Sequence, residues 1–113
     1  MQIEESINWY ERVNKRFERE CYHLKDKKFQ VRASSYQNGN IALHAFCDGE
    51  PWAMISVNIL HLPDGYFCAV TNNWPEVEAF LKQFDIASNT YKYAESGFCK
   101  YPIYKLDRRF TEV

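Results

Sequence analysis

The stretch FQVRASSYQNGNIALHAFC, residues 29–47, decides the fold class of this chain. Apolar and polar side chains alternate from Phe29 to Ser34, and this period of two is typical of a half-buried β-strand. Asn38-Gly39 separates this run from a second one over residues 41–47. Asn-Gly between two such runs is the strongest short signal for a β-hairpin, because both residues tolerate positive φ. The sequence therefore predicts two antiparallel strands joined by a tight turn.

The same pattern continues towards the C-terminus and extends the hairpin into a meander. Asp48-Gly49 marks a second turn, because both residue types favour tight connections. Strands over residues 52–60 and 66–71 complete the meander, and further strands are expected after the second helix, over residues 90–94 and 98–106. Pro102 has no backbone N–H, so we expect the last strand to lie at a sheet edge or to bend there.

Two helices are expected to pack on this sheet. Between residues 3 and 24, apolar side chains recur at spacings of three and four with charged residues between them, which indicates an amphipathic helix. Residues 25–28 interrupt this pattern and form a linker. A second helix is predicted over residues 74–84, with Asn73 as its N-cap and Pro75 in its first turn.

These elements predict an α+β fold: an antiparallel meander sheet of four to five strands, a long N-terminal helix and a second short helix. A length of 113 residues suits a single domain, 1–113. Residues 1–28 hold the first helix and its linker, and residues 29–107 hold the sheet and the second helix. We expect both helices on one face of the sheet, which leaves the other face open and rich in aromatic residues.

Composition excludes several classes of protein. Hydrophobic residues make up 46% of the chain, which is too many for a disordered protein. Lys and Arg number 14 against 15 Asp and Glu, and the net charge of −1 argues against a DNA binder that works by charge. Apolar runs span only a few residues, so no membrane span fits. The acidic first residues lack the apolar core of a secretory signal, and we expect a cytoplasmic protein.

The cysteines predict free thiols and no metal site. A structural zinc site needs closely spaced ligand pairs, and no Cys-x-x-Cys pair is present. In a reducing compartment we expect thiols that act as small apolar side chains. The four positions are Cys21, Cys47, Cys68 and Cys99. No Walker loop, HExxH motif or EF-hand loop occurs, and no cofactor is expected.

Three motifs together resemble a known family. They are Gly49-Glu50-Pro51-Trp52-Ala53 leading into Ser56-Val57-Asn58, then Val70-Thr71-Asn72-Asn73 before a helix, and the tail from Ser96 to Asp107. These motifs are similar to those of an uncharacterised family of small bacterial proteins carried by conjugative elements, plasmids and phages. The likeness spans residues 36–107, with Val70 where Asp is usual and Leu106 where Phe is common. It implies a mobile-element origin and a cytosolic setting, and it carries over no catalytic residues.

Aromatic residues make up 17% of the chain and mark the surface that we expect to bind a partner. Tyr is common at contact surfaces, because it buries a large area at a small entropic cost. A dense set lies near the C-terminus: Tyr91, Tyr93, Phe98, Tyr101 and Tyr104. The candidate partner-binding residues are Trp74, Asn72, Asn73, Phe98, Tyr101 and Tyr104. Each position also has a structural role open to it. Asn73 can cap a helix, Trp74 can cover the core, Gly97 can form a tight turn, and the tyrosines with Phe98 can form a cluster at the edge of the core.

These features point first to a non-catalytic binding protein of mobile-element origin. Its partner would be a host protein or protein complex, and its concrete form an inhibitor of host defence of the anti-CRISPR or anti-restriction type. The open aromatic face is also compatible with a homodimer.

Two alternatives stay open. A nucleic-acid-binding accessory protein would use the aromatic residues together with a basic helical stripe, Arg12, Lys15, Arg16 and Arg19. A small ligand-binding protein or enzyme would use His44, Cys99 or the acidic turns at Asp48, Glu50 and Asp64.

Overall fold

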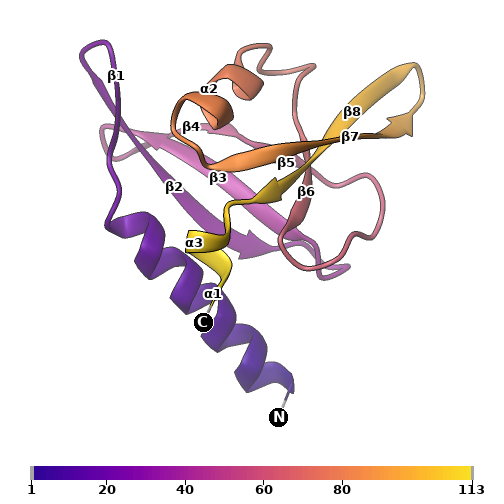
Figure 1. The fold of residues 1–113 in the computed structure, drawn as a ribbon, viewed down its shortest axis with the longest axis horizontal. Helices are drawn as coiled ribbons and strands as arrows, with labels where there is room; N and C mark the ends of the chain where they lie inside the picture. Colours follow the sequence, from indigo (N-terminus) through magenta and orange to yellow (C-terminus); the bar gives the residue numbers. More distant parts are fainter. Residues whose placement is uncertain (1, 113) are drawn as a thin grey trace.

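The computed structural model describes residues 2–112 of the chain, and side chains from Trp9 onward (Figure 1). The elements are α1 (Gln2–Glu18), β1 (Tyr22–Leu24), β2 (Lys27–Ser35), β3 (Ile41–Cys47), β4 (Glu50–Met54), β5 (Ser56–Val57), β6 (Tyr66–Ala69), α2 (Val77–Gln83), β7 (Ala87–Ser96), β8 (Cys99–Leu106) and α3 (Arg108–Thr111). The strands form two antiparallel sheets of four strands each. The predicted α+β class is confirmed.

The first sheet is the predicted meander, in the order β1-β2-β3-β4. Its central hairpin runs from the Phe29–Cys47 pair to the Ser35–Ile41 pair. The turn between these strands differs from the sequence expectation in one detail, because only Gly39 takes positive φ, at 90°. At the next turn both Asp48 and Gly49 have positive φ, 51° and 84°, as a type I′ hairpin turn requires.

The second sheet has the order β5-β6-β8-β7, and the chain enters it within the predicted strand 52–60. Ile55 divides that strand into β4, which belongs to the first sheet, and β5, which belongs to the second. The Ile55 N–H donates to Leu43 O at 2.9 Å, and the Ile55 carbonyl accepts from Val70 N at 3.0 Å. One extended stretch therefore joins both sheets. Eight strands in two sheets replace the four to five strands that were expected in one.

A single large core lies between the sheets and the helices. Val31 and Leu43 come from the first sheet, Phe67 and Leu106 from the second, and all four are buried. Phe17 of α1 stacks on Phe110 of α3 with ring centroids 4.3 Å apart. Burial of each such side chain contributes roughly 1.5–3 kcal/mol. These contacts fix the helices against the sheets.

The N-terminal helix is shorter than predicted: it ends at Glu18, not at residue 24. Residues 22–24 form β1, which pairs with β2 from Tyr22–Phe29 to Leu24–Lys27. The strand buries Tyr22 against Phe84, with ring centroids 5.1 Å apart. The contact between these rings and the pairing of β1 with β2 outweigh the local preference for helix. Cys21, which fits the helical spacing, is exposed and adds no core contact.

The second helix is also shorter than the predicted span 74–84, and Asn73 is not its N-cap. Glu76 occupies the cap position without a side-chain hydrogen bond, and Asn73 lies in a preceding turn. In that turn the Trp74 N–H donates to Val70 O at 3.0 Å, and Val77 N donates to Trp74 O at 3.0 Å. The chain thus turns twice before the helix begins.

Helix α1 closes an edge of the first sheet. β1 pairs with β2 only up to Phe29, so residues 30–35 have no strand neighbour on that side. The Asn14 side chain takes this place: its Nδ2 donates to Ala33 O at 2.9 Å, and its Oδ1 accepts from Ala33 N at 2.7 Å. Figure 1 shows α1 running beside β2. Among residues 2–112, none of the helices has the length and apolar character that a membrane crossing requires.

Candidate binding surface

The β7–β8 hairpin projects from the body of the molecule (Figure 1). β7 and β8 pair along their whole length, from Ala87–Leu106 to Ser96–Cys99. β6 pairs with β8 only from Tyr66–Lys105 to Cys68–Ile103. Beyond Ile103 the hairpin continues as a ribbon of two strands, and its tip is open on several sides.

Three of the five large hydrophobic residues that are exposed in the described chain lie on this hairpin. Tyr91 is 80% exposed, Tyr93 57% and Phe98 110%. The other two, Trp52 and Leu60, come from other parts of the chain. We call Tyr91, Tyr93 and Phe98 the hairpin surface. Exposed apolar groups gathered on one element commonly mark a site of protein contact.

A two-residue turn at the tip holds Phe98 away from the rest of the protein. Gly97 has φ of 61° and Phe98 follows it, which is the residue order of a type II′ turn. The expected tight turn with positive φ at Gly97 is therefore confirmed. No fold contact shields the Phe98 ring, and only a partner can remove it from water.

A bulge in β7 holds Tyr91. The ladder passes from the Asn89–Tyr104 pair directly to Lys92–Ile103, so Thr90 and Tyr91 have no partners in β8. Tyr91 has φ of 62°, a left-handed conformation that is a true outlier for a bulky residue. Residues held in such conformations cluster at functional sites.

Side chains of the bulge replace the missing ladder bonds. Asn89 Oδ1 accepts from Tyr91 N at 2.8 Å, and Thr90 Oγ1 accepts from Lys92 N at 3.2 Å. The Thr90 hydroxyl donates to Ile103 O at 2.7 Å. These three bonds fix the backbone that carries the exposed Tyr91 ring.

Two tyrosines of the predicted site belong to the core and not to the surface. Tyr101 is 6% exposed and Tyr104 5%, so neither ring can be a contact anchor. The Tyr104 hydroxyl donates to Glu78 Oε1 at 2.5 Å and thereby ties β8 to α2. Burial, followed by the nearby Glu78 carboxylate, raises the pKa of Tyr104. The sequence placed both on an open sheet face, whereas Tyr104 packs in the main core and Tyr101 in a second buried cluster with Cys68 and Ala94.

The residues before α2 have separate roles. Asn72 and Asn73 are exposed, whereas Trp74 is half-buried and packs against Phe80 with ring centroids 5.2 Å apart. Trp74 is thus a staple over the core, one of the two roles that the sequence allowed. Of the predicted partner-binding residues, only Phe98 belongs to the hairpin surface.

The basic stripe of α1 does not form a separate cationic surface. Lys15 and Arg19 are exposed, but exposed Glu11 and Glu18 interleave with them. Arg16 and Arg12 are half-buried, and the Arg12 Nε is buried without a hydrogen-bond partner. The exposed surface of α1 therefore carries acidic and basic side chains side by side, as the sequence predicts.

The residues of the ligand or enzyme hypothesis are dispersed. His44 is half-buried on β3 and packs against Phe46, with ring centroids 4.7 Å apart. Cys99 is exposed on β8. The acidic turn residues Asp48, Glu50 and Asp64 are all exposed. Among the side chains of residues 9–112, no three His, Cys, Asp or Glu come together as metal ligands would.

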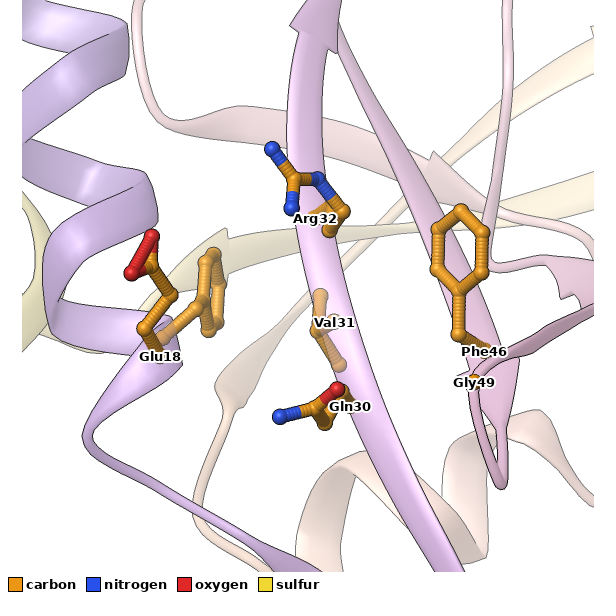
Figure 2. A pocket seen from close by; sticks show the side chains of 7 residues that line it. Glu18, Gln30, Val31, Arg32, Phe46 and Gly49 are labelled. Carbon is orange, nitrogen blue, oxygen red and sulfur yellow. The ribbon is translucent and has the colours of Figure 1, made fainter.

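A shallow depression of about 190 Å³ lies beside the end of α1 (Figure 2). Phe17 and Glu18 of α1 line it, together with Gln30, Val31 and Arg32 of β2 and Phe46 and Gly49. Glu18 and Arg32 supply opposite charges, and both are exposed to water. Exposed charges bind weakly because water competes for them. Nothing in the sequence pointed to this depression.

Comparison with known proteins gives one match. A family described as "Domain of unknown function (DUF4313)" matches residues 30–112. No curated protein and no solved structure matches the chain. The matched range includes residues 36–107, which carry the motifs of the expected family, and it leaves α1 and β1 outside. The chain belongs to the DUF4313 family.

Proposed function

We propose that this chain is a non-catalytic binding protein that acts by protein–protein contact through the hairpin surface. The observation that carries the proposal is the exposure of Tyr91, Tyr93 and Phe98 on one projecting hairpin. Leaving such rings in water gives up the free energy of their burial, roughly 1.5–3 kcal/mol for a Phe. A partner that covers them recovers this energy on binding.

The conformation of the hairpin also favours binding. The bulge bonds and the tip turn fix the backbone at Tyr91 and Phe98 before any partner arrives. Aromatic side chains have few rotatable bonds, so little conformational entropy is lost when they are covered. A prearranged surface of this kind binds more tightly than a mobile one of equal area.

The concrete form of the proposal is an inhibitor of host defence. Its motifs are similar to those of proteins carried by conjugative elements, plasmids and phages, as the sequence analysis describes. On this hypothesis the chain works in the bacterial cytoplasm and occupies a host protein or protein complex. Support comes from the motif likeness and from the small size of 113 residues.

A capture experiment with matched variants tests the proposal. The tagged wild-type chain is incubated with bacterial lysate beside a hairpin variant, Tyr91→Ser with Phe98→Ser, and a control, Leu60→Ser. Leu60 is an exposed apolar residue outside the hairpin. We expect the wild type and the control to retain the same proteins and the hairpin variant to lose them. Equal retention by all three folded chains would remove the hairpin surface from the proposal.

A further inference from the structure

The hairpin differs in charge from the rest of the chain. β7 and β8 with their turn contain Lys92, Lys100 and Lys105 against Glu95 alone, a net charge of +2. The whole chain has a net charge of −1, so the remaining residues sum to −3. The element with the exposed rings is therefore also the locally cationic one.

The lysines are engaged to different extents. Lys105 lies over the Tyr66 ring with its Nζ 5.5 Å from the centroid, at the base of the hairpin. Lys100 contacts Glu95 at 3.9 Å, and both side chains are about two-thirds exposed or more. Lys92 forms no ion pair within residues 9–112 and is exposed on the open edge strand beside the bulge. An exposed pair such as Lys100–Glu95 is weak and exchanges readily for a better partner.

Cationic side chains outnumber anionic ones on this element, and polar groups stand beside its exposed rings. Tyr91 and Tyr93 carry exposed hydroxyls, and Lys92 carries an ammonium group. Glu95 is the one carboxylate of the hairpin sequence, and it lies beside Lys100. The Asn89 and Thr90 oxygens accept from the backbone of the bulge. A surface that combines carboxylates with apolar groups complements an element of this charge and composition.

We infer that the hairpin surface binds an acidic protein segment with interspersed apolar residues; this inference rests on the proposed function. The rings cover the apolar residues, and carboxylates of the segment are reached by Lys100, on the face of the ribbon that carries Tyr93, and by Lys92, on the opposite face. A nucleic acid fits less well, because a chain with net charge −1 repels a polyanion at a distance.

Fluorescence anisotropy with defined probes tests the inference. The probes are a labelled peptide in which Glu alternates with Leu, its counterpart with Gln for every Glu, and labelled oligo(dT). We expect the Glu peptide to bind and the other two to bind at least about tenfold more weakly. Lys92→Gln with Lys100→Gln should weaken the Glu peptide by about tenfold. The control, Lys15→Gln with Arg19→Gln, removes the same charge from α1 and the turn that follows it, and should change binding by less than about twofold.

Each other outcome overturns the inference. Equal binding of the Glu and Gln peptides means that charge does not select the partner. An equal loss of affinity for the Glu peptide in the two double variants means that only the net charge of the chain affects binding. Tighter binding of oligo(dT) than of the Glu peptide assigns the hairpin to nucleic acid. Self-association of the chain in sedimentation, if the hairpin variant abolishes it, assigns the surface to a second copy. The Glu peptide can fail to bind while the Tyr91→Ser, Phe98→Ser chain still loses its lysate proteins. That result rejects this inference and leaves the proposed function standing.

Discussion

Tyr91 shows at the residue scale how a feature that is costly for folding can mark a contact site. Its left-handed backbone disfavours any side chain with a Cβ, and its ring is largely in water. Glycine would adopt this φ without strain. The fold alone therefore does not account for a tyrosine at this position.

Substitution of Tyr91 measures this strain directly. We expect Tyr91→Gly to raise the free energy of unfolding by about 0.5–1 kcal/mol, because relief of the left-handed conformation outweighs the added entropy of the unfolded chain. Tyr93→Gly is the matched control in the same strand. Tyr93 has ordinary negative φ, so its replacement should lower stability by about 1 kcal/mol. Urea denaturation measures both, and a loss of stability in both variants would contradict the strain argument.

Asn14 gives a second test at the residue scale. Asn14→Leu removes both bonds to Ala33 and leaves a buried backbone N–H and C=O unpaired. We expect it to lower the free energy of unfolding by about 2–3 kcal/mol. Lys15→Leu, on the exposed side of the same helix, should stay within about 0.5 kcal/mol of the wild type. Thermal and chemical denaturation report the difference, and equal effects of the two substitutions would contradict the role of the Asn14 bonds.

Residue roles could be predicted from the sequence only where they depend on local geometry. Gly97 was correctly placed in a tight turn, because a glycine between short strands favours that conformation. The burial of Tyr101 and Tyr104 was missed, because period-two spacing shows which residues share a face and not whether that face is covered. Tyr91 and Tyr93 were left out of the predicted site, since the bulge that orients Tyr91 depends on pairing with β8.

At the scale of elements, the hairpin tip depends on one turn. Gly97→Val places a β-branched side chain where φ is 61°, and we expect the last pairs between Glu95 and Lys100 to open. Hydrogen exchange should then be faster by about tenfold or more over residues 92–102 and unchanged in β2 and β3. Ser96→Val is the control, because Ser96 lies in ordinary strand conformation. Unchanged exchange in Gly97→Val would show that the turn does not limit the hairpin.

Element types were easier to predict than element ends. Both main helices and the first hairpin lie where the hydrophobic spacing indicates them. The end of α1 was misplaced because Tyr22 contacts Phe84, which is distant in sequence. The start of α2 was misplaced because Trp74 lies outside the helix and packs on Phe80 within it. Pro102 was expected either at a sheet edge or at a bend, and β8 is an interior strand. It is tolerated there because β6 stops pairing at Ile103.

At the scale of the whole molecule, buried phenols make stability depend on alkaline pH. Burial raises the pKa of Tyr22 and of Tyr104, and Glu78 adds to the shift at Tyr104. Unfolded tyrosines ionise with a pKa of about 10, so the folded chain holds these protons more tightly. Their contribution is fully present below pH of about 10 and is lost as pH rises above it.

Absorbance of tyrosinate during an alkaline titration checks this sign. The phenols of Tyr22 and Tyr104 should ionise together with cooperative unfolding above about pH 10. Tyr104→Phe should flatten the decline of stability above about pH 10, at the cost of the bond to Glu78 at neutral pH. Tyr91→Phe, an exposed control, should leave the slope unchanged. A steeper decline in Tyr104→Phe would reverse the assigned sign.

Because the chain passes directly from β4 to β5 at Ile55, the stability of one sheet is coupled to that of the other. A fluctuation that frees residues 50–57 breaks the outer ladder of both layers at once, since the same backbone supplies β4 and β5. We therefore expect the edge strands β4 and β5 to open together. The slowest-exchanging amides of β3 and of β6 should therefore report the same opening energy, as in a protein that unfolds in one step.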